Sequence, residues 1–346
     1  MSALASFRLG MASRKLIKVA AIIAFLYCTL LVYQGGVSNF QEPRVQVQDL
    51  TQIVPSSSSD LIDSVTKSSV NDSDTAKKIT LDDLFISVKT TKYYENTRLP
   101  VILKTWFQLA KNQTWFFTDR DNQAHQIQTN GHMVNTKCSP THSRNALCCK
   151  MAVEYDRYLE SNKKWFCHFD DDNYVNVPRL VEVLQRYDYK EDWYLGRTSV
   201  YKPVRIYQKS KKSKKMKLKY SFWFGTGGAG VCLSRSLALK MLPFASGGRF
   251  ISFCDNVRFP DDVSLGYLIE NIMHINLTVI PEFHSHLEQM KLLDTETLKD
   301  QVSFGYSVYN NEWNVVDVPV FDTSYDPTRF LSLHCFLFPH FKFCPR

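Results

Sequence analysis

Three consecutive carboxylates follow a strand-like apolar run. Residues 165–169 read Trp-Phe-Cys-His-Phe and lead directly into Asp170, Asp171 and Asp172. Adjacent carboxylates repel one another unless a cation or a network of hydrogen-bond donors compensates their charge. Because α/β folds place ligands at the carboxyl ends of their strands, the pattern predicts a divalent metal site there. The alternative is an acidic turn in which Asp172 or Asn173 caps a following helix.

The residue types at this corner suit a hard divalent cation. Mn²⁺ and Mg²⁺ prefer carboxylate and phosphate oxygens as ligands. Because an isolated acidic corner binds such ions weakly, we expect the diphosphate of a nucleotide to complete the coordination. The chemistry that the ion would supply is neutralisation of the diphosphate as it leaves a sugar carbon.

Two later motifs could contribute to the same site. His284 and His286 follow the apolar run 277–280, and their spacing of two would place both imidazoles on one face of an extended chain. Asp261 and Asp262 precede a helical stretch, and a carboxylate there could act as general base on an acceptor hydroxyl. The alternatives are two structural histidines and an aspartate that caps the helix.

Two common ligand motifs are missing from the sequence. The glycine-rich turn 225–230 lacks the Gly-Lys-Ser/Thr ending of a P-loop, so it predicts a tight bend or a close approach of backbone to a ligand. No pair of cysteines has C-x-x-C spacing, so a structural zinc site is not expected.

The positive charge of the chain is concentrated in one short segment. The formal net charge is +8. Seven lysines account for nearly the whole excess: Lys209, Lys211, Lys212, Lys214, Lys215, Lys217 and Lys219. This distribution argues against a nucleic-acid-binding face spread over the fold. The run predicts a solvated, mobile loop, and the alternative is a patch that binds phosphate or acidic glycans.

Alternating strands and helices must position the candidate side chains. Apolar runs predict strands that end near Val88 and others at 115–119, 164–169, 193–196, 231–233 and 277–280. Helical spacing of apolar residues predicts helices at 98–110, 143–160, 177–187, 235–242 and 263–271. The alternation predicts an α/β fold with a mainly parallel central sheet flanked by helices and a metal site at the carboxyl ends of its strands.

The first 79 residues differ in composition from the rest of the chain. Residues 1–15 carry three basic and no acidic side chains, and residues 19–33 carry no charge. We therefore expect a cytosolic tail at 1–15 and a transmembrane signal anchor at 16–36, with a cleaved signal peptide as the alternative. The polar segment 37–79 predicts a flexible luminal stem, followed by a luminal catalytic domain at 80–346.

Cysteines and glycosylation sequons agree with a luminal body. Eight of the nine cysteines lie beyond the apolar span, and acceptor sequons begin at Asn71, Asn112 and Asn276. Both features favour an oxidising secretory compartment. Eight cysteines allow 105 pairings, so spacing alone leaves their connectivity open.

These stretches together resemble the Fringe glycosyltransferases, members of the β1,3-glycosyltransferase group, from about residue 80 to the end. The matching segments are 165–176, 222–230, 245–248, 260–262, 283–288 and 344–346. The resemblance implies an A-type glycosyltransferase fold in a single-pass type II Golgi membrane protein. It implies transfer of N-acetylglucosamine (GlcNAc) from UDP-GlcNAc, with inversion, to the 3-hydroxyl of O-linked fucose. The acceptors would be EGF-like repeats of Notch and its ligands, and the modification would modulate Notch signalling.

The resemblance also implies roles for individual residues. The metal ligands fall on Asp172 and His286, which would hold Mn²⁺ or Mg²⁺ together with the UDP diphosphate. The catalytic base falls on Asp262, which would take the proton from the fucose 3-hydroxyl as that oxygen attacks the anomeric carbon. The donor-binding arginine falls on Arg98, and Asp171 is a donor-contacting acid. Asp170 receives no role.

Disulfides and departures complete what the resemblance implies. Three bridges are expected: Cys138 to Cys149, Cys167 to Cys232, and Cys335 to Cys344. Cys148 and Cys254 are left unassigned. This chain departs from the family pattern in its lysine-rich insertion 209–219, at Gly225 where alanine is common, and at Phe343 where tryptophan is common. These departures bear on loop behaviour and acceptor affinity rather than on the metal site.

Two other functions share the acidic triplet. A β1,3-galactosyltransferase acting on protein-linked glycans would keep the fold and change the sugars. A non-catalytic luminal glycan-binding protein would keep the fold without turnover, although an intact set of Asp172, Asp262 and His286 argues against it. A panel of UDP-sugars and acceptors would discriminate among the three.

Overall fold

The computed structural model describes residues 78–209 and 216–346. The tail, the signal anchor at 16–36, nearly all of the stem and the Asn71 sequon lie outside these residues, so those expectations stay predictions. Among the residues that are described, no helix is both long enough and apolar enough to cross a membrane.

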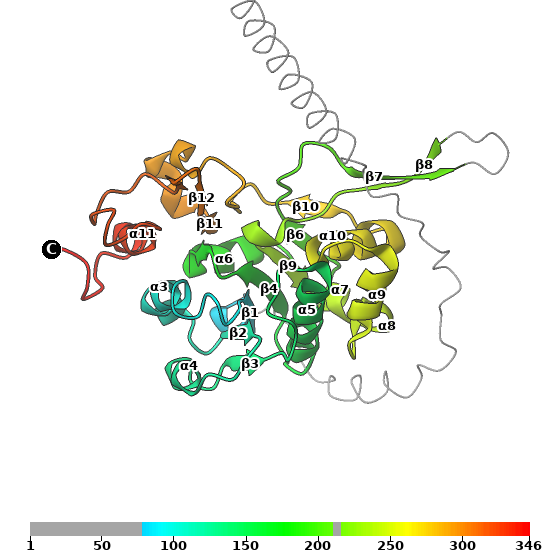
Figure 1. The fold of residues 1–346 in the computed structure, drawn as a ribbon, viewed down its shortest axis with the longest axis horizontal. Helices are drawn as coiled ribbons and strands as arrows, with labels where there is room; N and C mark the ends of the chain where they lie inside the picture. Colours follow the sequence, from blue (N-terminus) through cyan, green and yellow to red (C-terminus); the bar gives the residue numbers. More distant parts are fainter. Residues whose placement is uncertain (1–77, 210–215) are drawn as a thin grey trace, which may run out of the picture. The chain divides into compact units, whose positions relative to one another are not determined.

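A seven-stranded sheet forms the centre of the described fold (Figure 1). Its strands run in the order β10-β6-β9-β4-β1-β2-β3. β9 is antiparallel to β4 and β6, and the other neighbouring pairs are parallel. The strands are β1 (Leu84–Lys89), β2 (Thr114–Thr118), β3 (Met133–Asn135), β4 (Trp165–Asp170), β6 (Tyr194–Gly196), β9 (Val231–Ser234) and β10 (Leu277–Val279). The predicted α/β class with a mainly parallel sheet is therefore confirmed.

Helices cover both faces of this sheet (Figure 1). Successive side chains of a strand point to opposite faces, and accordingly Phe85 and Phe166 join one apolar cluster while Ile86 and Cys167 join the other. The first cluster includes α5 (Arg144–Leu159), α7 (Arg235–Lys240), α8 (Leu242–Ala245), α9 (Arg249–Val257) and α10 (Asp261–Gly266), which continues as a π-helical turn, Tyr267–Ile272. The second includes α3 (Leu99–Lys104), α6 (Val177–Leu184) and α11 (Phe330–Leu337). A short helix, α4 (Gln123–Gln128), precedes β3.

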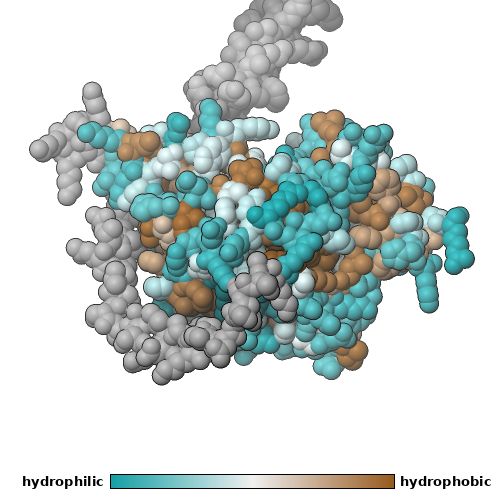
Figure 2. All heavy atoms as spheres, turned by 180° about the vertical axis from the view of Figure 1, so that it is seen from behind, coloured by the Kyte–Doolittle hydropathy of each residue, from teal (hydrophilic) through white to brown (hydrophobic). Residues whose placement is uncertain are grey.

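Three two-stranded sheets lie beside the central one. They pair β5 (Asn173–Val175) with β11 (Ser303–Gly305), β12 (Ser307–Tyr309) with β13 (Glu312–Asn314), and β7 (Val204–Lys209) with β8 (Met216–Phe222). On the face seen in Figure 2, hydrophobic residues interrupt a largely hydrophilic surface.

The predicted lysine loop is partly wrong. β8 begins at Met216, so Lys217 and Lys219 lie in a strand that pairs with β7 and projects from the fold (Figure 1). Backbone pairing with β7 keeps the chain at these lysines extended, although the first three residues of β8 are exposed. The segment 210–215, which carries four more lysines of the run, is outside the described residues.

One predicted helix is interrupted. Residues 98–110 form α3 and a separate 3₁₀ turn, Trp106–Leu109, instead of one continuous helix. The break is at Thr105, whose backbone has φ −110° and ψ −117°. Its hydroxyl donates to the carbonyl of Val101 at 2.6 Å, a local bond that competes with regular helix geometry.

Four disulfides staple the described fold. The three expected bridges, Cys138–Cys149, Cys167–Cys232 and Cys335–Cys344, are confirmed. The fourth joins Cys148 in α5 to Cys254 in α9, which settles the pair that the sequence left open. Cys167 and Cys232 face each other in the register of β4 and β9, so that bridge links two central strands.

Candidate active site

The acidic triplet lies at the carboxyl end of a central strand. Asp170 is the last residue of β4, and Asp171 and Asp172 form the turn into β5. Asn173 fixes this turn, because its side-chain oxygen accepts the Asp170 N–H at 3.0 Å. The helix-cap alternative is wrong: α6 begins only at Val177, after β5, and neither Asp172 nor Asn173 is its N-cap residue.

Arg98 and Asp171, the two predicted donor-binding residues, are brought into contact. The guanidinium donates to Asp171 Oδ1 at 2.6 Å and to Asp172 Oδ2 at 3.3 Å. Thr90 donates to the other oxygen of Asp171 at 2.7 Å, so both oxygens of this buried carboxylate are bonded. The ring of Tyr94 lies 3.8 Å from the guanidinium carbon, a cation–π contact that helps to fix Arg98.

Asp172 and His286, the two predicted metal ligands, are also brought together. The distance from Asp172 Oδ2 to His286 Nδ1 is 3.9 Å. Asp172 Oδ1 and His286 Nδ1 are buried and have no hydrogen-bond partner among the described residues, which is costly for polar atoms unless a ligand satisfies them. A carboxylate oxygen and an imidazole nitrogen are both suitable ligands for Mn²⁺, so these two residues are suited to hold such a cation.

The protein supplies only part of a coordination sphere. Within 78–209 and 216–346, no group of three or more histidine, cysteine, aspartate or glutamate side chains could hold a metal ion. A pair of protein ligands leaves most positions of a hard cation to phosphate oxygens and water, as is usual where the metal binds with a nucleotide.

Electrostatics at this pair favour exchange of a proton for a cation. Burial, together with repulsion from Asp170 and Asp171, raises the pKa of Asp172 to about 8 even though Arg98 opposes the shift. Burial lowers the pKa of His286, so its imidazole is neutral at physiological pH and its nitrogen can act as a ligand.

His284 does not reach this site. Its Nδ1 lies 3.2 Å from Glu288 Oε2 and its Nε2 lies 2.9 Å from Gln301 Oε1. Residues 283–286 do not form a strand, so a spacing of two no longer places the two imidazoles on one face. The expectation that both histidines could approach one site is wrong, and His284 is structural.

Asp261 and Asp262 occupy the first turn of α10 and have different partners. Pro260 is the N-cap residue, so the capping alternative for these aspartates is wrong. Asp261 Oδ2 accepts a hydrogen bond from Lys89 Nζ at 2.7 Å. Asp262 forms no ion pair in the described structure; its oxygens accept the backbone N–H of Gly227 at 3.3 Å and of Val263 at 2.8 Å.

The environment of Asp262 suits a base. Burial raises its pKa to about 6, and repulsion from Asp261 adds to this, while the N–H of Gly227 and the charge of Lys89 act in the opposite direction. A carboxylate with a pKa just below neutrality is ionised at physiological pH yet accepts a proton readily.

The glycine-rich turn separates the metal-ligand pair from the base. Gly227 begins a 3₁₀ turn, Gly227–Ala229, and a Cβ built on it would lie 3.7 Å from Asp262 Cβ. A Cβ on Gly228 would lie 3.1 Å from His286 Nδ1 and Cε1, which is tighter than ordinary packing. Asn173 donates to the carbonyl of Gly228 at 2.7 Å and so ties this turn to the acidic corner.

Four charged or titratable residues at this edge were missed by the sequence reasoning: Lys89, Glu154, His168 and Asp170 as a partner of Lys89. Lys89 is the last residue of β1 and lies beside Asp170, the last residue of β4. A lysine at the end of an apolar strand was the feature of the sequence that could have indicated its role. Glu154 is fully buried in α5, where the helical pattern predicted only apolar core residues. Glu154 Oε2 lies 2.6 Å from His168 Nδ1.

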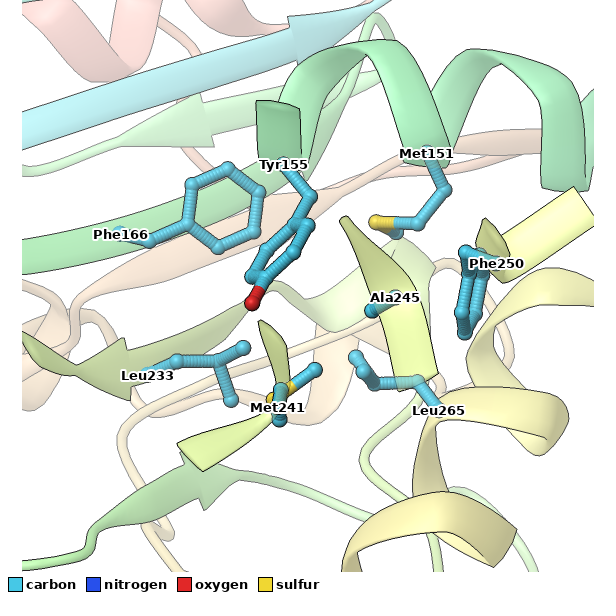
Figure 3. Close-up of a pocket in the computed structure, with 8 residues that line it drawn as sticks. All are labelled: Met151, Tyr155, Phe166, Leu233, Met241, Ala245, Phe250 and Leu265. Atoms are coloured by element: carbon cyan, nitrogen blue, oxygen red, sulfur yellow. The ribbon is translucent and has the colours of Figure 1, made fainter. Parts of the chain in front are cut away.

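A small apolar pocket elsewhere in the fold is not part of this site (Figure 3). It lies among residues of α5, the sheet and the helices that follow β9, and no polar surface lines it. Its volume of about 10 Å³ is barely that of one water molecule. The pocket is a packing gap in the core and not a binding site for a nucleotide.

Comparison with known proteins identifies relatives that span the site. Residues 79–341 match the Fringe-like family model. A Fringe glycosyltransferase of Drosophila melanogaster is 59% identical over 265 residues, which are 77% of this chain and 64% of that protein. A β-1,3-N-acetylglucosaminyltransferase radical fringe of Gallus gallus is 47% identical over 272 residues, which are 78% of this chain and 72% of that protein. The chain thus spans just under two thirds of the Drosophila relative.

Similarity to solved structures is weaker. A crystal structure of a glycosyltransferase involved in the glycosylation of the major capsid of PBCV-1 aligns with 64% of this chain and 93% of its own, at 13% identity and a TM-score of 0.34.

Proposed function

This chain belongs to the Fringe family, and from that premise we propose that it is an inverting, metal-dependent glycosyltransferase. It moves GlcNAc from UDP-GlcNAc to the 3-hydroxyl of O-linked fucose on EGF-like repeats of Notch and its ligands, and so modulates Notch signalling. The observation that carries the proposal is one turn of backbone, Gly227–Ala229. Its Gly228 lies against the ring of His286, whose Nδ1 is 3.9 Å from Asp172 Oδ2. Its Gly227 N–H donates to Asp262, a carboxylate that forms no ion pair among the described residues.

Asp172 and His286 hold the divalent cation in this proposal, with Mn²⁺ preferred over Mg²⁺ because an imidazole is present. When bound, the cation supplies neutralisation of the charge that develops on the departing diphosphate. Two observations support this role: the two buried ligand atoms have no hydrogen-bond partner among the described residues, and burial with repulsion from Asp170 and Asp171 raises the pKa of Asp172.

Asp262 acts as the general base. It takes the proton of the acceptor hydroxyl as that oxygen attacks the anomeric carbon, and UDP leaves from the opposite face, so the configuration is inverted. Two features support this role: Asp262 forms no ion pair among the described residues, and burial raises its pKa to about 6. The backbone N–H of Gly227 fixes one carboxylate oxygen.

Arg98 and Asp171 bind the donor. Arg98 remains charged and contacts both Asp171 and Asp172, so it links the donor side of the site to the metal ligands. A guanidinium at this position is suited to the negative charge of the diphosphate. Its other neighbours, Tyr94 and Tyr306, limit its movement.

The acceptor side is assigned to the hairpin β12–β13. Asn314 donates to the carbonyl of His286 at 2.9 Å, which fixes the hairpin beside the proposed metal ligand. Tyr309 and Trp313 expose 76% and 44% of their surfaces there. Large exposed side chains next to a reaction centre suit contact with a folded glycoprotein acceptor.

We also propose that the chain is a single-pass type II protein of the Golgi membrane. The support comes from the sequence: an uncharged segment within 16–36, a basic flank on its N-terminal side and a polar segment after it. The four disulfides of the described fold agree with an oxidising compartment.

A panel of donors and acceptors tests the function. Purified protein with Mn²⁺ is offered UDP-GlcNAc, UDP-galactose and UDP-glucose, with an O-fucosylated EGF repeat and its unfucosylated form as acceptors. The proposal predicts transfer only from UDP-GlcNAc and only to the fucosylated repeat. Transfer of galactose would instead make the chain a β1,3-galactosyltransferase, and binding without any transfer would make it a glycan-binding protein.

A further inference from the structure

Lys89 carries a buried ammonium group that joins the two acidic corners of the site. It is the last residue of β1, and 11% of its side chain is exposed. Its Nζ lies 2.7 Å from Asp261 Oδ2 and 3.1 Å from Asp170 Oδ1. These carboxylates come from α10 and β4, elements that are about ninety positions apart in the sequence.

The central sheet fixes the backbone position of Lys89. Lys89 pairs with Asp170 in the parallel register of β1 and β4, two strands in the middle of the central sheet (Figure 1). The position of its Cα is therefore set by backbone pairing on both sides, because β2 pairs with the other edge of β1. A short reach from this anchored Cα brings Nζ to the first turn of α10.

A second buried pair lies against the ammonium group. His168 Nε2 is 3.5 Å from Lys89 Nζ, and the other ring nitrogen of His168 is 2.6 Å from Glu154 Oε2. Ser87 donates to the same glutamate oxygen at 2.5 Å. Ser87, Glu154 and His168 are fully buried, so the surroundings of Lys89 are held in one arrangement.

The contacts of Lys89 divide two adjacent carboxylates into different roles. Asp261 is bound to the ammonium group, whereas Asp262, the next residue, receives only backbone N–H donors. Without Lys89, Asp261 would be a buried carboxylate that lies next to the base and has no cation to compensate its charge. Leaving one buried charge unpaired is strongly unfavourable and shifts the groups around it.

We propose that Lys89 is a positioning residue that compensates the charge of Asp261 in the first turn of α10 and thereby keeps Asp262 aimed at the acceptor hydroxyl. The inference rests on the proposed function, in which Asp262 is the base. Lys89 acts through Asp261 and touches neither substrate nor the proposed metal ligands. Asp170, the other carboxylate that contacts Lys89, also lies 3.6 Å from His168 Nε2. Removal of Lys89 is therefore expected to reduce turnover and to spare donor binding.

The test compares Lys89→Met with a lysine at the other end of the same two strands. Lys164, just before β4, pairs with Asp83, just before β1, at 3.2 Å. For Lys89→Met we expect kcat to fall about 100-fold, the loss that a displacement of about 1 Å can cause. The KM for UDP-GlcNAc and the Mn²⁺-dependent Kd for UDP should stay within about threefold. Lys164→Met should keep the kcat of the unaltered protein.

Two further variants separate positioning from folding. Asp261→Asn alone should lower kcat less than about fivefold, because Asp261 is not the base. Lys89→Met combined with Asp261→Asn removes the unpaired charge and should recover at least about tenfold of the kcat lost in Lys89→Met, a coupling that only contacting residues show. UDP affinity and the thermal unfolding midpoint are measured for every variant, so a misfolded protein is recognised directly.

Several outcomes would overturn the inference. Unchanged kcat in Lys89→Met would do so, and so would a double variant no faster than Lys89→Met. A parallel loss of kcat and UDP binding would assign Lys89 a purely structural role. These results differ from failure of the proposed function, which would appear as no GlcNAc transfer by the unaltered protein and would remove both proposals together.

Discussion

The two acidic corners of the site are built from the same residue type and solve the same electrostatic problem in different ways. At 170–172, Lys89 and Arg98 compensate Asp170 and Asp171. The remaining acid, Asp172, has one oxygen, Oδ1, without a hydrogen-bond partner among the described residues, and its Oδ2 lies 3.9 Å from His286 Nδ1. At 261–262, Lys89 compensates Asp261, and the remaining acid, Asp262, lies against the backbone N–H of Gly227.

The difference lies in what surrounds the acid that has no strong ion pair. A neutral imidazole beside Asp172 adds a second ligand, so that corner suits a cation. Two backbone N–H donors, of Gly227 and Val263, fix the carboxylate of Asp262 without neutralising it, so that corner suits proton transfer. Neighbouring side chains, and not the aspartates themselves, therefore determine which corner binds metal and which acts as base.

The largest expected effect comes from removing the base. Asp262→Asn should lower transfer by about 10³-fold, within the range of a general base, because an amide cannot accept the proton of the acceptor hydroxyl. The measurement is the single-turnover rate with an O-fucosylated EGF repeat. Asp261→Asn is the matched control, one residue away. A normal rate in Asp262→Asn would show that the two corners do not divide the work in this way.

Substitution of each of the two histidines tests the metal-binding corner at 170–172. His286→Asn should weaken Mn²⁺-dependent UDP binding by about 10- to 100-fold, since it removes one of two protein ligands. His284→Asn should leave the Mn²⁺ dependence unchanged, because His284 contacts Glu288 and Gln301 and not Asp172. Titration of both variants with Mn²⁺ at fixed UDP gives the comparison. Equal losses in both would mean that the effect is structural.

The pH dependence of transfer reports on the base corner. The pKa of Asp262 is raised to about 6 in the free protein, so below that pH the carboxyl is protonated and cannot act as a base. We expect kcat/KM to fall as pH decreases through about 6, approaching tenfold per pH unit, at a Mn²⁺ concentration that saturates at every pH. A profile that stays flat down to pH 5 would contradict the assignment of Asp262.

The smallest effects are expected in the turn between the corners. Gly228→Ala would place a Cβ 3.1 Å from the His286 ring and should raise the Kd for Mn²⁺ severalfold by displacing that ligand. Gly227→Ala meets its neighbours at 3.7 Å and beyond, which is ordinary contact, and should change the Kd for Mn²⁺ by less than about twofold. A larger increase in the Kd for Mn²⁺ in Gly227→Ala than in Gly228→Ala would contradict this prediction.

Much of the fold followed from the sequence because its signals are local. Apolar runs marked the central strands, and Ser143 and Ser234 cap the helices that were expected after them. The missed features depend on pairing between distant segments. The lysines of β8 lie in a strand only because β7 pairs with them, and β3 has only two apolar residues, Met133 and Val134, too few to mark a strand without its pairing to β2.

The site was predictable to a similar degree. Asp172, His286, Arg98 and Asp171 were named from the resemblance to the Fringe glycosyltransferases, and the structure brings them together. Lys89 was missed because its role requires the register of β1 with β4 and the approach of α10, neither of which the spacing of residues reveals. His284 was misjudged because residues 283–286 are not extended as a strand would be.

Binding of UDP, measured by calorimetry with and without Mn²⁺ in Asp172→Asn and Asp262→Asn, tests the division between the two corners most directly. Asp172→Asn should lose the Mn²⁺-dependent part of UDP binding, while Asp262→Asn should bind UDP as the unaltered protein does and yet transfer sugar about 10³-fold more slowly. Unchanged UDP affinity in Asp172→Asn, or Mn²⁺-dependent binding lost equally in both variants, would contradict the account.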